Sequence, residues 1–303
     1  MAASHEMLWR PHLPTDVRLT LAPLVRGAGD PSHRVGPDGA FWRATWTPAG
    51  PATLRLAQQS GQVSATAWGP GAEAVLAGVP DLLGARDSLA GFEPRHPLLV
   101  EVHARHPGLR LPRTGAVFEQ LVPAVIEQKV TGQEARAAYR WLLHRYGEPA
   151  PGPAPRGMRV PPPADVWRRI PSWDWHRAGV DPRRMRTVMS AARVASRLEE
   201  AVGMEPDAAL ARLRAVPGVG EWTAAEVAQR ALGHPDTISV GDYHLSQLVG
   251  WALVGRPLDD AGMVALLEPW RPHRQRVVRL LELSGVAKPR FGPRLTIQDH
   301  RAV

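Results

Sequence analysis

The sequence contains a short glycine- and proline-rich turn whose composition suits the binding of a phosphate group. The turn is Pro217-Gly218-Val219-Gly220, and it separates a predicted amphipathic helix that ends at Val216 from another that spans 222–232. Its glycines allow positive φ and carry no Cβ that would keep a phosphate from the backbone amides, while the second helix directs its positive end to the same place. Such a hairpin holds a phosphate without reading base sequence. The alternative is a plain connector, because short Gly/Pro motifs recur by chance.

Asp242 is the second feature whose type and position suggest chemistry. It follows the extended stretch 237–240 and precedes a predicted helix whose apolar face includes Leu245, Leu248 and Val249. Aspartate is a preferred helix N-cap, and that role alone would explain its position. The two roles are compatible, because a helix N-terminus stabilises an ionised carboxylate and so favours a group that acts as an anion and not as a proton donor.

The composition limits what this site can be. The chain has 303 residues, of which 44% are hydrophobic, which is enough for a globular core. It has no cysteine, so disulfides, cysteine zinc sites, thiolate nucleophiles and iron–sulfur clusters are excluded. Of 37 basic residues only Lys129 and Lys288 are lysine, and the formal charge of +8 is therefore mostly guanidinium, which suits nucleic acid. Coding pressure toward arginine on an ordinary solvated surface explains the charge equally well.

The order of predicted elements divides the chain into an N-terminal α+β domain (1–100), a helical region (101–285) and a basic tail (286–303). The first domain has predicted strands at 17–21, 41–46, 53–58 and 63–68, in an antiparallel sheet with a helix at 72–83 on one face. Helical spacing begins at Phe118, and a second helix starts at a capping box formed by Thr131 and Glu134. An exposed proline-rich connector (147–163) interrupts the helical region, and further helices are predicted at 165–170, 184–200 and 207–215.

Three segments resemble the helix-hairpin-helix DNA glycosylases. LRAVPGVGEWTAAEVAQRALGHPDTISVGDYHL is similar to their signature, in which a Gly/Pro-rich hairpin is followed by a catalytic aspartate. HPGLRLPRTGAVFEQLVPAVIEQKVTGQEA and EPWRPHRQRVVRLL are similar to segments of the 3-methyladenine DNA glycosylase II (AlkA) branch. The resemblance implies a mainly α fold with an N-terminal α+β domain and two helical subdomains that flank a DNA cleft. It covers 107–285 strongly and the preceding residues in outline.

The resemblance implies that Asp242 is the catalytic carboxylate of an enzyme that removes a damaged base from duplex DNA. Hydrolysis of the N-glycosidic bond passes through an oxocarbenium-like state, which a carboxylate stabilises and which water positioned by it can trap. The base must first be flipped from the stack into a pocket. Related bifunctional enzymes have a Schiff-base lysine where this chain has Trp222, so we expect a monofunctional glycosylase without lyase activity. The missing cysteines also separate the chain from the iron–sulfur branches.

The resemblance places Trp222 and Tyr243 at the rim of the base pocket, where an aromatic face stacks on an electron-poor base. An ordinary core position is the alternative for either ring. Two further aromatic positions of the branch fall here on Glu226 and Glu282. If these line the pocket, their carboxylates would accept hydrogen bonds from an exocyclic amine or attract a cationic base; otherwise they are solvated helix charges. The damaged base is expected to be alkylated, with a deaminated or oxidised base as the alternative.

Residues outside the pocket are expected to contact the duplex: the hairpin residues Pro217, Gly218, Val219, Gly220 and Thr223, the pair Gln128 and Lys129, and the arginines Arg183, Arg184 and Arg274. The pair stands where the branch has an apolar wedge that fills the gap left by the flipped base. Lys129 would serve either as that wedge or as a phosphate contact. The arginines would meet the DNA backbone and would not specify a base sequence.

The expected partner is double-stranded DNA that contains a damaged base, bound by a monomer. No catalytic metal and no cofactor are expected, with a structural monovalent cation at the hairpin–phosphate contact left open. The sequence lacks the run of ~18 apolar residues that a membrane span needs and lacks the apolar segment of a signal peptide, so a cytoplasmic, nucleoid-associated protein is expected. The rival from another class is a non-catalytic helix-hairpin-helix module that binds distorted DNA.

Overall fold

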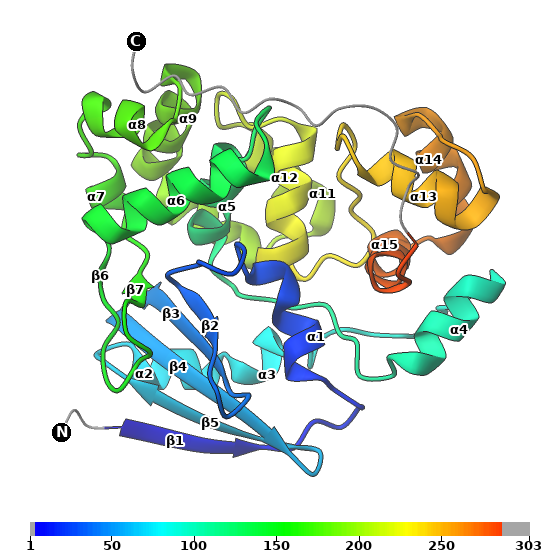
Figure 1. Ribbon diagram of the computed structural model, residues 1–303, viewed down its shortest axis with the longest axis horizontal. Helices are drawn as coiled ribbons and strands as arrows, with labels where there is room; N and C mark the ends of the chain where they lie inside the picture. Colours follow the sequence, from blue (N-terminus) through cyan, green and yellow to red (C-terminus); the bar gives the residue numbers. More distant parts are fainter. Residues whose placement is uncertain (1–3, 287–303) are drawn as a thin grey trace.

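The computed structural model describes residues 4–286, in which a five-stranded antiparallel sheet lies beside a larger helical body (Figure 1). The strands lie in the order β1-β5-β4-β3-β2. Their bounds are Ser4–Trp9 (β1), His33–Val35 (β2), Phe41–Thr47 (β3), Gly50–Gln59 (β4) and Gln62–Trp68 (β5). The predictions of strands at 41–46, 53–58 and 63–68 are confirmed, whereas β1 and β2 have no predicted counterpart.

Residues 17–21 are helical, so the strand predicted there is wrong. They form α1 (Val17–Leu21), which begins at Asp16, whose side chain accepts a hydrogen bond from the Leu19 amide at 2.9 Å. Apolar residues at 17, 19 and 21 fit the alternation of a strand, but Val17, Thr20 and Leu21 are the buried positions, at i, i+3 and i+4. Over five residues the two patterns overlap, and the capping aspartate favours the helix.

Short helices α2 (Ala72–Ala77) and α3 (Val79–Leu82) follow the sheet, so the single helix predicted at 72–83 is interrupted at Gly78. α2 packs on β1, β4 and β5. The buried side chains of these helices join those of α1 and the sheet in one hydrophobic cluster, which includes Leu21, Leu54 and Val79. The N-terminal residues therefore have a core of their own.

The proline-rich segment 147–163 is not simply an exposed connector. It forms a two-stranded sheet, β6 (Glu148–Pro149) with β7 (Arg159–Val160), and β7 packs on β3 and β4. Met158 and Val160 are buried there in a cluster with Trp42 and Trp68, whose rings stack at 5.6 Å. The apolar residues between the prolines thus dock the segment onto the N-terminal sheet.

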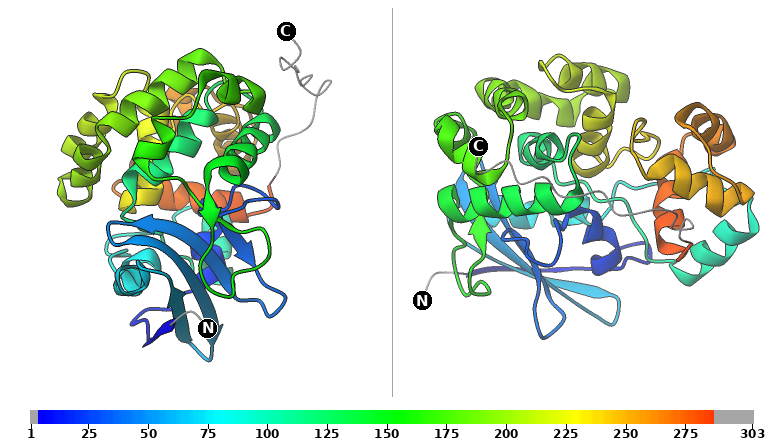
Figure 2. Two further views of the ribbon diagram at one scale, coloured as in Figure 1. Left: turned by 90° about the vertical axis from the view of Figure 1, so that its left-hand side faces the viewer. Right: turned by 45° about the horizontal axis from the view of Figure 1, so that its top comes forward.

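The helical body contains two hydrophobic clusters, one built from α5 to α12 and one from α4 and α13 to α15 (Figure 2). The bounds of these helices are Pro97–Arg105 (α4), Val117–Ile126 (α5), Gly132–Tyr146 (α6), Ala164–Trp167 (α7), Ser172–Ala178 (α8), Pro182–Arg193 (α9), Ala195–Glu199 (α10), Pro206–Arg214 (α11), Glu221–Val227 (α12), Leu245–Val254 (α13), Asp260–Leu267 (α14) and Arg274–Leu283 (α15). α4 straddles the predicted boundary at residue 100 and packs on α15.

The predicted fold class, mainly α with an N-terminal α+β part, is confirmed. The capping box at Thr131 and Glu134 is present, whereas the helix predicted at 184–200 is divided at Val194. None of the helices within 4–286 is both long and apolar enough to cross a bilayer. The predicted basic tail lies outside the described residues, apart from Val286.

α5 lies at the centre of the helical body and is the helix to which the N-terminal sheet is attached. All of its residues except Glu119 are buried, as expected for a helix that is apolar on every side. Glu119 accepts a hydrogen bond from Arg43 of β3 at 2.8 Å. At the other end of α5, Arg26 donates to both carboxylate oxygens of Glu127, at 3.0 and 2.9 Å. These two contacts fix the sheet against both ends of α5.

Leu121→Ala is expected to destabilise the protein by ~2–5 kcal/mol, because Leu121 is fully buried in α5 and its truncation leaves a cavity that the neighbours fill only in part. Leu8→Ala is the control, since Leu8 in β1 is 63% exposed, and its expected effect is below ~0.5 kcal/mol. Urea unfolding followed by tryptophan fluorescence measures both. Equal losses would contradict the central position of α5.

Candidate active site

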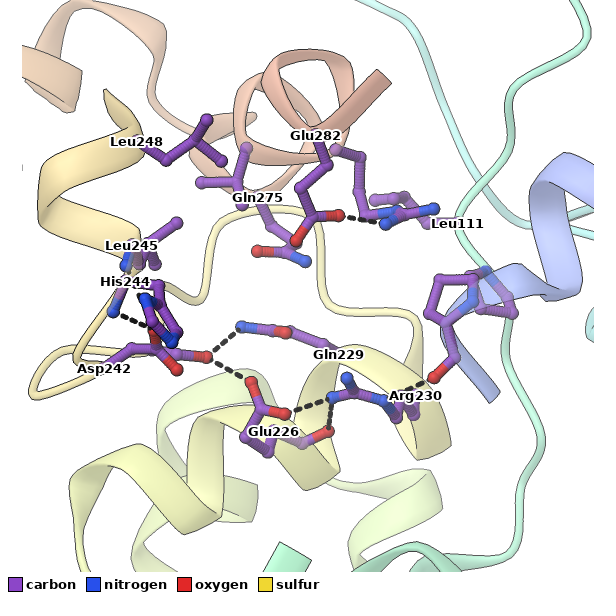
Figure 3. Close-up of a pocket in the computed structure, with 15 residues that line it drawn as sticks. Leu111, Glu226, Gln229, Arg230, Asp242, His244, Leu245, Leu248, Gln275 and Glu282 are labelled. Carbon is purple, nitrogen blue, oxygen red and sulfur yellow. Dashed lines mark hydrogen bonds and ion pairs between the residues drawn. The ribbon is translucent and has the colours of Figure 1, made fainter. Parts of the chain in front are cut away.

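A cavity of about 140 Å³ opens between the two clusters of the helical body (Figure 3). One wall is formed by α12 and by the π-helical turn Ala228–Leu232 that continues it. The opposite wall is formed by α13 and α15. Asp242 lies between the walls, on the segment that leads from the π-helical turn to α13, and Pro23 of the N-terminal part completes the lining.

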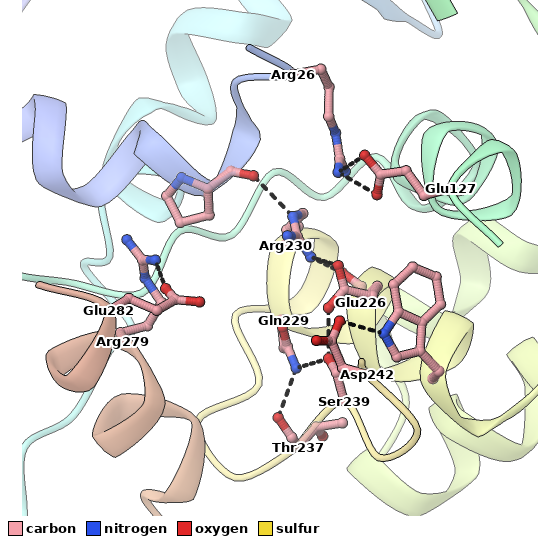
Figure 4. A network of polar contacts seen from close by, with 12 residues as sticks. Arg26, Glu127, Glu226, Gln229, Arg230, Thr237, Ser239, Asp242, Arg279 and Glu282 are labelled. Atoms are coloured by element: carbon pink, nitrogen blue, oxygen red, sulfur yellow. Dashed lines mark hydrogen bonds and ion pairs between the residues drawn. The ribbon is translucent and has the colours of Figure 1, made fainter. Parts of the chain in front are cut away.

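The Asp242 carboxylate is held from two directions. Its Oδ1 accepts hydrogen bonds from the backbone amides of His244 at 2.8 Å and Leu245 at 3.0 Å, at the start of α13. Its Oδ2 accepts a hydrogen bond from the Trp222 indole N–H at 3.1 Å (Figure 4). Three N–H donors therefore orient the group, and an arrangement of donors alone suits an anion. The carboxylate caps the turn into α13 and lines the cavity with the same side chain.

Trp222 and Tyr243 both adjoin Asp242, and their position at the rim of a base pocket stays a prediction. Neither ring lines the cavity. Trp222 is the second residue of α12, and its position is set by the hydrogen bond to Asp242. Tyr243 is 72% exposed and contacts the His244 ring edge-on, with the centroids 4.9 Å apart. The structure therefore connects Trp222 to the site through its indole N–H.

Glu226 and Glu282 both line the cavity, from opposite walls; Glu226 is half-buried, whereas Glu282 is exposed. Glu226 already has two partners, because its Oε2 accepts from Arg230 at 2.8 Å and its Oε1 accepts from the Ser239 hydroxyl at 2.6 Å. Glu282 forms an ion pair with Arg279 of the same helix. The walls thus hold polar groups beside aliphatic ones such as Leu245, Leu248 and Val278, and both glutamates are paired.

The segment before Asp242 is fixed to the α12 wall by the same network (Figure 4). Gln229 donates to the Thr237 carbonyl at 2.9 Å and to the Ser239 hydroxyl at 3.0 Å. His234 accepts hydrogen bonds from the Asp236 and Thr237 amides through Nδ1, at 3.2 and 3.1 Å. Burial lowers the pKa of His234, which favours the neutral ring that such acceptance requires. Asp242 is therefore positioned from both of its neighbouring segments.

The hairpin residues divide into buried and exposed positions. Val219 is 6% exposed and belongs to the larger helical cluster, whereas Pro217, Gly218 and Gly220 are exposed. Gly218 has φ +91°, and a Cβ there would lie 2.1 Å from the Thr187 hydroxyl oxygen. Gly220 is extended, with φ −92°, so it does not use the positive φ that a glycine allows. A Cβ on Gly220 would meet no protein atom within 4 Å, which leaves this position open to a partner.

Gln128 and Thr223 brace the hairpin from within. The Gln128 side-chain amide donates to the Gly218 carbonyl at 3.0 Å and to the Thr223 hydroxyl at 2.8 Å. Thr223 is only 2% exposed, so the phosphate contact predicted for it is wrong. Lys129 is exposed at the tip of the same turn between α5 and α6, with φ +55°. Gln128 therefore fixes the turn to the hairpin, and Lys129 projects from it.

Two of the three arginines predicted to contact DNA are structural. Arg184 is 6% exposed and donates to the Ile126 carbonyl at 2.6 Å, which ties α9 to the end of α5. Arg274 is 8% exposed and donates to Asp236 at 2.7 Å. Buried guanidinium groups with these partners are not available to phosphates, so both predictions are wrong. Arg183 is exposed on the first turn of α9.

The sequence interpretation missed the polar residues Gln229, Arg230, Ser239, Gln275 and Arg279, all of which line the cavity. A signal for two of them exists in the spacing, because 275, 279 and 282 fall at i, i+4 and i+7 on one face of α15. No comparable pattern marks Ser239. Within 4–286, no group of three or more His, Asp or Glu side chains is placed to hold a metal ion.

No family model matches the chain. Over 182 residues it is 31% identical to the probable bifunctional transcriptional activator/DNA repair enzyme AlkA of Mycobacterium tuberculosis, a match that covers 59% of this chain and 35% of that protein. Its structure is similar to the 3-methyladenine DNA-glycosylase of Archaeoglobus fulgidus, with a TM-score of 0.76 and 17% identity over 92% of this chain and 98% of the other. It is also similar to the DNA-bound 8-oxoguanine glycosylase/lyase of Clostridium acetobutylicum, with a TM-score of 0.71 and 10% identity over 94% and 96% of the two chains.

These similarities show which fold the chain has. It has the fold of the two DNA glycosylases named above, and over 182 residues it is similar in sequence to the curated AlkA relative. The chain spans about a third of the length of the curated relative that it matches, and the structural likeness concerns the fold.

Gly218→Ala is expected to destabilise the protein by more than ~1 kcal/mol, since the residue has positive φ and its Cβ would collide with Thr187. Gly220→Ala is the matched control in the same hairpin, and a change within ~0.5 kcal/mol is expected because its backbone is extended and its Cβ would lie in open space. Urea unfolding compares the two. A similar decrease in the free energy of unfolding for both variants would show that the two glycines share one conformational role.

Proposed function

We propose that the chain is a monofunctional DNA glycosylase of base excision repair. It acts as a monomer on double-stranded DNA, flips out a damaged, alkylated base and hydrolyses the N-glycosidic bond without a metal or cofactor. The observation that supports this most directly is that the Asp242 carboxylate lines a cavity and is also hydrogen-bonded to Trp222, the second residue of the hairpin helix. A phosphate held by the hairpin would then place the sugar of a flipped nucleotide in a fixed relation to the carboxylate.

The hairpin supplies the phosphate contact in this proposal. Gly218 and Gly220 are exposed, and a partner can approach the Gly220 backbone without meeting a side chain. Amides at the start of α12 complement the negative charge. This grip is independent of base sequence, as a repair enzyme that must find lesions in any context requires.

Asp242 supplies the chemistry. An alkylated purine nucleoside with a charged ring loses its base as a neutral molecule, so the enzyme has to stabilise the sugar cation and direct water to it. Each carboxylate oxygen can accept two hydrogen bonds, and Oδ2 accepts one from the Trp222 indole. A second acceptor position is therefore left to face the sugar or to orient water.

The names of the relatives support the same function. The M. tuberculosis relative is described as a probable DNA repair enzyme, and the A. fulgidus protein as a 3-methyladenine DNA-glycosylase. The C. acetobutylicum protein is a glycosylase/lyase that was solved with 8-oxoguanine DNA. A glycosylase for an oxidised or deaminated base is the second candidate, and the polar lining that includes Glu226 and Glu282 favours it over a purely stacking pocket.

Asp242→Asn is expected to lower base release by at least ~100-fold, because the variant keeps the size of the side chain and loses the negative charge that stabilises the sugar cation. Single-turnover release from duplex DNA treated with a methylating agent measures this, and affinity for duplex DNA with an abasic-site analogue is expected to be unchanged. Asp259→Asn is the matched control, since Asp259 caps α14 by accepting from the Gly262 amide at 2.8 Å and does not line the cavity. Near-normal base release by Asp242→Asn would contradict the role of Asp242 as the catalytic carboxylate.

Absence of lyase chemistry is the second expected result. Trp222 occupies the position of the Schiff-base lysine of bifunctional relatives, and Lys129 at the α5–α6 turn is the lysine within 4–286. With lesion-containing oligonucleotides, strand breaks are expected only after alkali, and borohydride is expected to trap no covalent complex. Wild type and Lys129→Arg should behave alike in both assays. A trapped complex would contradict the monofunctional mechanism.

A further inference from the structure

The α15 wall of the cavity contains a glutamine whose side chain has no partner. Gln275 is 6% exposed and lines the cavity, and Figure 3 shows its carboxamide pointing into the space between the two walls. Its Oε1 is buried, and no group among residues 4–286 forms a hydrogen bond with the carboxamide. A buried amide without a partner is destabilising, and such groups are typical of places where a ligand supplies the missing hydrogen bonds.

Neighbouring polar groups on the α12 wall do not satisfy this carboxamide because they are bonded to one another. Glu226 accepts from Arg230 and Ser239, and the Gln229 amide donates to Thr237 and Ser239. On α15 itself, Arg279 pairs with Glu282 beyond Gln275. Gln275 therefore presents an unpaired acceptor and an unpaired donor side by side.

We infer that Gln275 binds the N6/N7 edge of a flipped adenine derivative. A carboxamide holds its oxygen and its NH₂ group in one plane, which matches the adjacent N6 amine and N7 acceptor of adenine, the pairing by which glutamine recognises adenine in duplex DNA. The inference rests on the proposed glycosylase function. It narrows the substrate to adenines alkylated at positions other than N6 and N7, such as N3-alkyladenines, and makes Gln275 a specificity-determining residue.

Other damaged purines lack part of this edge. 7-Methylguanine has a methyl group at N7 and an oxygen in place of the N6 amine, hypoxanthine has an oxygen in place of the amine, and 1,N6-ethenoadenine has no N6 hydrogen. Each leaves the Gln275 oxygen unpaired. The expected discrimination is that of one bidentate pair, about 5- to 150-fold.

The test compares wild type with Gln275→Leu, in which a side chain of similar size has no hydrogen-bonding group. Single-turnover release of 3-methyladenine and 7-methylguanine is measured from one preparation of dimethyl sulfate-treated duplex DNA, and release of hypoxanthine and ethenoadenine from oligonucleotides. Gln275→Leu is expected to lower 3-methyladenine release about 5- to 150-fold and to leave the other rates nearly unchanged. Gln247→Leu is the matched control, because Gln247 lies on α13, donates to Leu258 and does not line the cavity.

A second variant separates recognition from folding. Gln275→Glu keeps an acceptor for the N6 amine and loses the donor to N7, so it is expected to retain part of the 3-methyladenine preference that Gln275→Leu loses. Equal losses for all four bases, or no loss, would overturn the role of Gln275. Wild type that releases bases without preferring 3-methyladenine would overturn the inference and leave the proposed function intact. Wild type that releases no base would overturn both.

Discussion

The hydrogen bond from the Trp222 indole to the Asp242 carboxylate joins the two halves of the site. Trp222 belongs to the helix that begins at the hairpin, and Asp242 belongs to the segment that leads into α13, so this contact connects the hairpin helix to the cavity. Gln128 extends the connection, because it binds the Gly218 carbonyl and the Thr223 hydroxyl from the turn after α5. The positions of the hairpin, the Asp242 carboxylate and the turn between α5 and α6 are thus interdependent, as the proposed reaction would require in order to place one sugar against one carboxylate.

The N-terminal part of the chain helps to position the cavity walls and supplies few of the polar groups that line the cavity. Arg26 fixes it to Glu127 at the end of α5, and the Pro23 carbonyl accepts a hydrogen bond from Arg230 at 2.9 Å. Arg230 in turn holds Glu226, whose other oxygen binds Ser239 on the segment before Asp242. A continuous chain of polar contacts therefore runs from the N-terminal domain to the segment that positions Asp242. Buried networks of this kind favour one arrangement over its neighbours, since each member would be costly to leave unpaired.

The sequence was sufficient for the features whose evidence is local. The hairpin, the capping box at Thr131, the strands β3 to β5 and the helix after Asp242 depend on residues close together in the chain. The predicted DNA contacts failed where a partner distant in sequence decides the role of a side chain. Arg274 is buried and donates to Asp236, and Thr223 is buried and accepts from Gln128. The strand predicted at 17–21 failed for a different reason, since five residues are too few to separate a strand from a helix by periodicity. Gln275 was missed because an unpaired amide becomes visible only when its surroundings are known.

The indole of Trp222 also fits a site in which a carboxylate acts without a nucleophilic lysine. A lysine amine at this position would compete as a nucleophile for the sugar, whereas the indole N–H can only donate, and here it donates to the Asp242 carboxylate. The residue that removes lyase chemistry in the proposed mechanism therefore also orients Asp242. The cavity is lined by polar and by aliphatic side chains, so in the proposed mechanism its polar groups would select a base by its hydrogen-bonding pattern. Hydrogen bonds to the edge of a base discriminate between bases more strongly than stacking does. Every base has a π face, but few bases share one pattern of donors and acceptors.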